Sequence, residues 1–141
     1  MLNYKLKTLK GKTNFDVLFK NAFKFFEKDA AIFVSYKDLN ESVGLTPITE
    51  PIEIHYAVTA RKRKVRKAVM RNRIKRLLRE SLRQIFDDYS TKNKITKLGE
   101  FVIVWNSAPV RPGMIKLSDV LPVAQKLIER AESYRKKQDN H

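Results

Sequence analysis

Basic side chains at helical spacing are the part of this chain best suited to a chemical task. One stripe along a helix would contain residues four positions apart: Lys67, Arg71, Lys75 and Arg79. A second stripe lies further round the same helix and contains Arg66, Arg73, Arg76 and Arg83. A guanidinium group offers paired N–H donors that match two oxygens of one phosphate. The spacing therefore predicts contacts with the phosphate backbone of a nucleic acid.

The basic stretch as a whole runs from Arg61 to Arg83. It holds 12 Lys and Arg residues and one acid, Glu80, so it carries +11 of the chain's net charge of +15. Runs of like charge are usually solvated or disordered. This run also contains apolar residues that can hold it on a core: Val65, Ala68, Val69, Ile74, Leu77, Leu78 and Leu82. Because so much like charge repels itself, we expect a polyanionic partner rather than a solvated helix.

Other kinds of chemistry find little support in the sequence. Its four glycines are scattered, so there is no Gly-rich phosphate loop, and no Ser–His–Asp set or HExxH motif occurs. The absence of cysteine excludes disulfides and thiolate chemistry, and the two histidines, His55 and His141, make a metal site improbable. We therefore expect no catalytic residue and no metal ligand in the protein itself, and a function in binding.

Composition indicates one domain of 141 residues, since 43% hydrophobic and 32% charged residues are a globular mixture. We expect its ends, residues 1–12 and 134–141, to be flexible. There is no run of 18 apolar residues and no apolar stretch like that of a signal peptide. We therefore expect no membrane association and a cytoplasmic protein.

The elements that position the basic stretch are predicted from periodicity. A short helix over residues 14–23 would be capped by Thr13 or Asn14. Strands are predicted over three ranges rich in β-branched and aromatic residues: 30–36, 52–60 and 101–105. Residues 37–51 and 106–113 carry turn formers and are predicted loops, and residues 87–100 a polar connection.

Two longer helices complete the prediction. The basic helix runs from near Val65 to about Phe86, but Val65 and Val69 fall on a different face from the later apolar residues. Either the regular helix begins after Val65, or its first turns pack against something else. A closing helix starts at Ser118 and carries one apolar stripe. Together these elements predict an α+β fold, one sheet with helices packed on it.

RNA suits this architecture better than DNA. A helix-turn-helix protein is mostly helical, whereas this chain has at least three predicted strands. RNA recognition also uses aromatic side chains that stack on unpaired bases. Phe15, Phe19 and Phe33 could do this if they line the sheet, although simple core packing also accounts for Phe15 and Phe19. We expect residues 1–141 to form a single RNA-binding domain.

The segment from Val65 to Arg79 reads V-R-K-A-V-M-R-N-R-I-K-R-L-L-R. It closely resembles the RNR motif of the bacterial ribonuclease P protein component. That motif has an aliphatic residue, an Ala three positions later, then Arg-Asn-Arg, an aliphatic residue, Lys-Arg and a further basic residue, and all of these positions match. The sequence departs from most relatives at Arg66, where they have Gly. The basic opening segment and the order of elements are also similar.

The resemblance implies a fold and a role. The fold is a two-layer α/β sandwich of ribosomal-protein type with an unusual left-handed β-α-β crossover. The role is that of the protein subunit of ribonuclease P, a ribonucleoprotein endoribonuclease that removes the 5′ leader from precursor tRNA. The RNA subunit performs the hydrolysis with Mg²⁺ that it mainly binds itself. The implied partners are the catalytic RNA and precursor tRNA, with the protein a monomer within the holoenzyme.

The resemblance also implies site residues. The leader would lie in a cleft between the sheet and the first helix, lined by Phe15, Phe19, Ala31, Phe33, Arg71 and Lys75. The catalytic RNA would contact Asn72, Arg73, Arg76 and Arg79, with support from Arg63, Lys64, Arg66 and Lys67. The alternatives are a non-enzymatic structural RNA-binding protein, such as a ribosomal protein, and a DNA-binding regulator.

Overall fold

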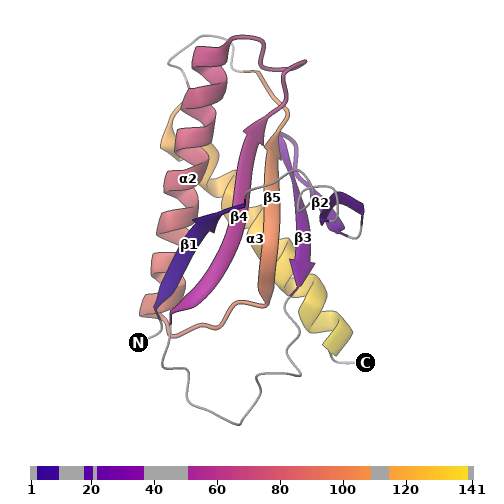
Figure 1. The fold of residues 1–141 in the computed structure, drawn as a ribbon, viewed down its shortest axis with the longest axis vertical. Helices are drawn as coiled ribbons and strands as arrows, with labels where there is room; N and C mark the ends of the chain where they lie inside the picture. The colour runs from indigo at the N-terminus through magenta and orange to yellow at the C-terminus, as the bar shows by residue number, and fades with distance from the viewer. Residues whose placement is uncertain (1–2, 10–17, 21, 37–50, 109–114, 140–141) are drawn as a thin grey trace.

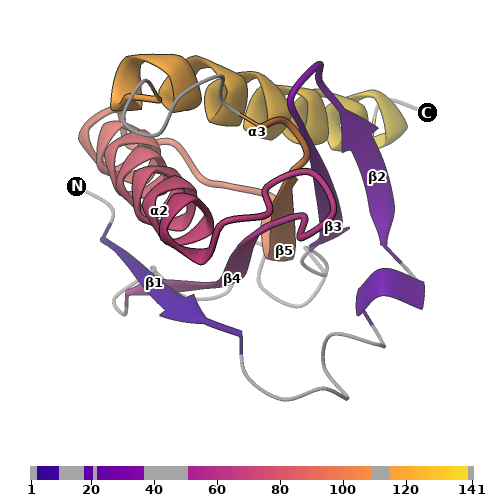
Figure 2. The ribbon, with the colours of Figure 1, turned by 90° about the horizontal axis from the view of Figure 1, so that it is seen from above.

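A five-stranded mixed sheet with two long helices on one of its faces forms the structure, a computed structural model (Figures 1 and 2). It describes residues 3–9, 18–20, 22–36, 51–108 and 115–139. The strands are β1 (Tyr4–Thr8), β2 (Phe23–Phe26), β3 (Ala30–Tyr36), β4 (Ile52–Ala60) and β5 (Leu98–Trp105), and the helices are α2 (Ala68–Thr91) and α3 (Leu117–Asp139).

The strand order is β1-β4-β5-β3-β2. β1, β4 and β5 are parallel neighbours, while β3 runs antiparallel to both β5 and β2. In Figure 1 β4 and β5 point upward, with β5 to the right of β4, and the view from above in Figure 2 places α2 behind the sheet. A chain that moves right through a connection behind the sheet has a left-handed crossover, the rare sense for a β-α-β unit. The two-layer sandwich and its handedness agree with the implied fold.

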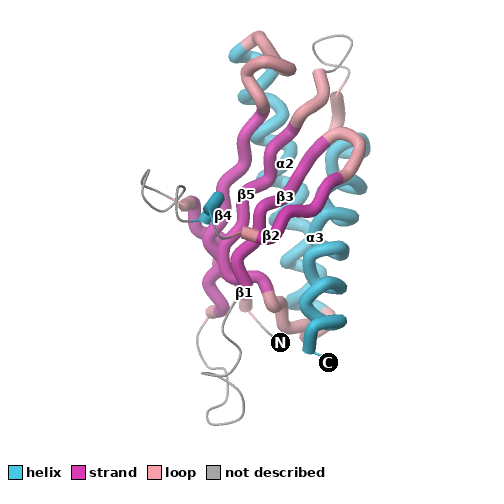
Figure 3. The backbone as a smooth tube through the Cα atoms, turned by 90° about the vertical axis from the view of Figure 1, so that its right-hand side faces the viewer, coloured by secondary structure: helices cyan, strands magenta, loops and turns pink. Residues whose placement is uncertain are grey.

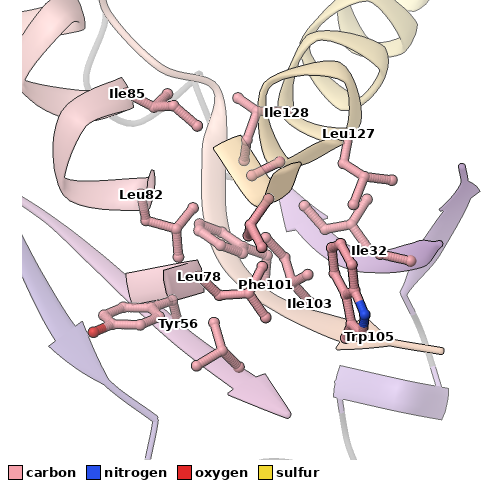
Figure 4. Packing of buried hydrophobic residues seen from close by; sticks show 14 of the residues in the cluster. Ile32, Tyr56, Leu78, Leu82, Ile85, Phe101, Ile103, Trp105, Leu127 and Ile128 are labelled. Carbon is pink, nitrogen blue, oxygen red and sulfur yellow. The ribbon is translucent and has the colours of Figure 1, made fainter. Parts of the chain in front are cut away.

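The core lies between the sheet and the two helices (Figure 4). Alternate residues of β5 enter it, and the apolar stripe of α2 meets them through Ile74, Leu78 and Leu82, which are fully buried. The stripe of α3 closes the layer with Leu127 and Ile128. Each such side chain contributes about 1.5–3 kcal/mol of burial free energy. The predicted core faces of both helices are therefore confirmed.

The start of α2 explains why Val65 and Val69 fall on a different face from the later apolar residues. The helix begins at Ala68, later than the predicted start, and Val69 in its first turn is 79% exposed. Val65 is buried instead in the connection that precedes the helix, where its N–H bonds the carbonyl of Arg61 at 2.8 Å. The first of the two sequence alternatives is thus correct.

Two predicted boundaries need correction: the predicted end of α2 was too early and the predicted start of β5 was too late. The helix continues past Phe86 to Thr91, because Tyr89 packs against Phe86 with ring centroids 5.2 Å apart. β5 begins at Leu98 rather than Phe101, and Leu98 is fully buried. Strands β3 and β4 have the predicted bounds.

Regular elements occupy part of both ends of the chain, which were expected to be flexible. Tyr4–Thr8 forms an edge strand, β1, paired with β4, so this part of residues 1–12 is held in the sheet. The closing helix continues through Asp139 rather than fraying from Tyr134.

The predicted first helix also needs correction. Only residues 18–20 of it are described as helical, and Phe23, its predicted last residue, begins the unpredicted strand β2. Residues 14–17 and 21 of that helix lie outside the described residues, as do the predicted loop residues 37–50 and 109–113.

Candidate nucleic-acid interface

The sheet face opposite α2 and α3, here called the open face, carries three rows of side chains. Residues paired across neighbouring strands point to the same side, so the register defines each row. The upper row contains Thr59, Val104, Ala31 and Phe26; the middle row contains Ala57, Val102, Phe33 and Lys24; the lower row contains His55, Glu100 and Ser35.

Phe33 in the middle row forms an aromatic pair with Phe19. Their ring centroids are 4.9 Å apart and their planes meet at 76°, an edge-to-face geometry. Lys24 Nζ lies 5.6 Å from the centre of the Phe33 ring, within cation–π range. Phe19 keeps 39% of its surface exposed and Phe33 is half-buried, so both rings stay accessible. Such a pair can stack on unpaired bases.

A small apolar cluster supports this pair from the neighbouring strands. Leu9 and Leu18 are buried against Ala57 and Val102, which are the β4 and β5 members of the middle row. The segment that carries Phe19 is thereby anchored to the open face. Ala31, a predicted leader residue, is 2% exposed and can only form a floor.

The lower row ends beside charged residues that pair with one another. Glu53, beside this row on β4, binds Lys7 Nζ at 2.8 Å and lies 3.6 Å from His55 Nε2. The hydrogen bond from Lys7 and its positive charge lower the pKa of the Glu53 carboxyl, which favours the ionised form. The acids of the open face, Glu53 and Glu100, thus lie at this end, whereas the aromatic pair and Lys24 lie in the middle row.

The basic connection, residues 61–67, leaves the sheet at its other end. The Arg61 N–H donates to the Trp105 carbonyl at 2.8 Å, which ties the connection to β5. Arg71 Nη1 donates to the carbonyls of Val65 and Arg66 at 2.9 and 2.8 Å. Arg71 thus stabilises the turn before α2, a role that the sequence did not suggest.

The predicted RNA contacts on α2 differ in their surroundings. Asn72, Arg76 and Arg79 are exposed, whereas Lys75 is half-buried. Arg73 is also half-buried, and its Nε donates to the Ile115 carbonyl at 3.0 Å. The supporting residues Arg63, Lys64, Arg66 and Lys67 are all exposed.

The structure groups the predicted leader residues only in part. Phe19 and Phe33 lie together on the open face, and Ala31 is on the same face two residues before Phe33. Arg71 and Lys75 belong instead to α2 in the helix layer. α2 packs against β4, β1 and α3. Phe15 lies outside the described residues.

Positive charge is concentrated near the start of α2. Among the described residues, no Lys or Arg from Arg61 to Arg79 forms an ion pair with a carboxylate. The acid of the basic stretch, Glu80, instead binds Arg83 at 2.6 Å, and this hydrogen bond lowers the pKa of the Glu80 carboxyl. The exposed side chains of Arg76 and Arg79 therefore make this side of α2 electropositive.

Two residues that sequence reasoning missed, Lys24 and Phe26, belong to the same open face as Phe33. They were overlooked because residues 14–23 were interpreted as one helix and no element was predicted over residues 24–29. The alternation of Phe and Lys in F-K-F-F, just before the turn at residues 27–29, was the available signal.

Metal-binding and membrane-spanning features are not found in the described part of the chain. Its His, Asp and Glu side chains form no group of three or more that could hold a metal ion. None of its helices is long and apolar enough to cross a membrane.

Comparison with known proteins identifies the family. A sequence model of ribonuclease P matches residues 4–112. The chain belongs to the ribonuclease P family. It is accordingly a ribonuclease P protein subunit, with a role in tRNA processing and RNA as its partner.

The fold comparison agrees with ribonuclease P membership. The RNase P protein of Staphylococcus aureus superposes with a TM-score of 0.57 at 12% identity, covering 89% of this chain and 94% of that one. A mutant of the S. aureus RNase P protein with defective mRNA degradation activity gives 0.57 at 15% identity, covering 88% and 86%. At 12% and 15% sequence identity, these two matches show a similarity of fold alone. Curated protein sequences give no significant match.

Proposed function

We propose that this ribonuclease P protein binds the enzyme's catalytic RNA through residues 61–67 and the exposed side of α2. Its open face would hold the 5′ leader of precursor tRNA at Phe19 and Phe33. The observation that carries the proposal is the dense positive charge from Arg61 to Arg79, which has no carboxylate partner among the described residues. A folded polyanion next to this edge would relieve its self-repulsion.

The two surfaces would perform different tasks. Exposed Arg76 and Arg79 supply charge-assisted hydrogen bonds to phosphates of the catalytic RNA. The Phe19–Phe33 pair supplies ring surfaces for unpaired leader bases, which mature tRNA lacks. The protein would thus favour precursor over product without touching the reacting phosphate.

Hydrolysis itself is assigned in this proposal to the RNA subunit. Mg²⁺ would supply phosphate charge neutralisation there and would be held mainly by RNA oxygens. Among the described residues, no three His, Asp or Glu side chains gather into a group that could hold a metal ion. We place the reaction in the cytoplasm, the compartment that the cysteine-free sequence suits.

Reconstitution tests the proposal. The chain is added to ribonuclease P RNA, and cleavage of precursor tRNA is followed as Mg²⁺ is lowered. We expect the protein to restore cleavage at Mg²⁺ concentrations where the RNA alone is inactive. A variant with Arg76 and Arg79 changed to Gln should restore less, whereas Lys126→Gln on α3 should behave as the unchanged protein. Absence of stimulation at every Mg²⁺ concentration would overturn the assignment.

A further inference from the structure

Phe26 is the most exposed phenylalanine among the described residues, with 61% of its surface accessible. It pairs with Ala31 across β2 and β3, so it points to the open face, the same side as Phe33. Phe26 and Phe33 are diagonal neighbours of the antiparallel pair, about 7–8 Å apart between their Cα atoms. Together with Phe19 they form a series of three accessible rings.

The other phenylalanines of β2 point to the opposite side of the sheet from Phe26. Phe23 and Phe25 point to the helix side, where their rings lie 5.2 and 5.5 Å from the ring of Tyr134. Within the described part of the chain the Phe26 ring contacts no other aromatic ring. Its position therefore leaves a ring face open to a ligand.

The charges around Phe26 favour an anionic ligand. Lys24 lies directly opposite Phe33 in the middle row, two residues before Phe26 on the same face of β2, and already approaches the Phe33 ring. The nearest acid in sequence, Glu27, is turned away, because its side chain is 16% exposed and its carboxylate binds Arg130 Nε on α3 at 2.7 Å. Lys20 and Lys28 are exposed. A base-stacking surface edged by lysines suits single-stranded RNA.

The position of Phe26 along the sheet also matters. It stands at the end where β3 starts, and Ala30 there pairs with Trp105, whose carbonyl accepts the N–H of Arg61. The β2–β3 turn and the basic connection thus share the upper end of the sheet in Figure 3. A strand that passes Phe33 and Phe26 runs toward the basic connection and away from Glu53 and Glu100.

On the basis of the proposed function, we infer that Phe26 and Lys24 extend the leader site to the β2 edge. Phe26 stacks on a leader base beyond the one at Phe33, and Lys24 contacts the phosphate between them. The leader then leaves the sheet beside residues 61–67.

Affinity of the reconstituted holoenzyme for precursor and mature tRNA tests this inference. Phe26→Ala should weaken precursor binding about tenfold, at the lower end of the range for a lost stacking contact, and leave mature tRNA unchanged. Phe26→Trp should retain precursor affinity. The matched control is Phe23→Ala, which removes the same ring from the opposite face of the same strand. Lys24→Gln should lower the slope of log K against log salt by about one.

The possible outcomes separate this inference from the proposed function. If Phe33→Ala weakens precursor binding and Phe26→Ala does not, the extension is wrong and the proposed leader site stands. If neither variant has an effect, the leader site itself is wrong. Equal losses for Phe26→Ala and Phe23→Ala would indicate a general effect on β2 and overturn the inference. With leaders shortened by single nucleotides, the two ring effects should disappear at different lengths; disappearance at one length would also overturn it.

Discussion

The rings of Phe19 and Phe33 meet edge to face at 4.9 Å, although 13 residues and an intervening strand separate them in the sequence. The contact joins the segment before β2 to the middle of the sheet. Because Leu18 is buried beside Phe19, the aromatic pair rests on a fixed apolar base rather than on a free loop. A leader base that stacks here would meet a surface already formed, and less binding energy would be lost in ordering it.

Phe33→Ala should therefore weaken binding of precursor tRNA by about 1–3 kcal/mol, the usual effect of losing one stacking contact. Mature tRNA has no leader and should bind as before. Equilibrium binding to the reconstituted holoenzyme measures both. Equal losses for the two RNAs would contradict the leader role of Phe33.

Arg76 and Arg73 should respond differently to replacement by Gln. Arg76 is exposed, so Arg76→Gln should lower the slope of log K against log salt for the catalytic RNA by about one, with the melting temperature unchanged. Arg73→Gln also removes the hydrogen bond to the Ile115 carbonyl and should destabilise the protein by about 1 kcal/mol. Salt titrations and thermal unfolding separate the two effects. Identical behaviour would show that the Arg73–Ile115 bond contributes nothing.

Substitutions at Val65 and Val69 form a matched pair, because both replace valine near the start of α2 but only Val65 is buried. Val65→Ala removes buried methyl groups beside the start of α2 and should cost about 1–2 kcal/mol of unfolding free energy. Val69→Ala changes an exposed side chain and should stay within about 0.5 kcal/mol. Denaturant unfolding measures both. A larger loss at Val69 would mean that α2 begins earlier than Ala68.

Tyr89 should make stability depend on pH in the alkaline range. Burial raises the pKa of its hydroxyl well above the ordinary value of 10.0, and Glu132 adds a smaller repulsion. The unfolded chain therefore loses this proton first, so the stabilisation is complete below pH 10 and declines as pH rises further. Tyr89→Phe should show a shallower decline above pH 10. The measurement is the unfolding free energy of the unchanged protein and of Tyr89→Phe across that pH range. Parallel curves for the two proteins would contradict the raised pKa of Tyr89.

Much of this fold can be predicted from the sequence wherever a repeating pattern of apolar side chains defines a buried face. The stripe through Ile74, Leu78 and Leu82 and the apolar run of β5 both give the correct buried face, because burial is the dominant favourable term. The edge strands β1 and β2 were missed because each is short and one side of it is bordered by solvent. Lys5 and Lys7 in β1 then resemble a flexible basic tail, although the strand pairs with β4.

The candidate site is harder to predict than the fold. The interval between Arg71 and Lys75 places them on one side of a helix, but it cannot show that this helix lies in the layer behind the sheet. Nor can it show that the guanidinium of Arg71 already binds two carbonyls. Such assignments depend on contacts between segments distant in the chain, which spacing alone does not encode.

The pairings of β1 with β4 and of β3 with β5 have a consequence for how the protein is made. Tyr4 meets Ile52 and Ala30 meets Trp105, so the chain must be synthesised as far as Trp105 before β5 can pair fully with its neighbours. High contact order slows folding, and the concentrated positive charge opposes collapse in the meantime. RNA present during synthesis would screen that charge, so co-expression with the catalytic RNA should raise the yield of folded protein.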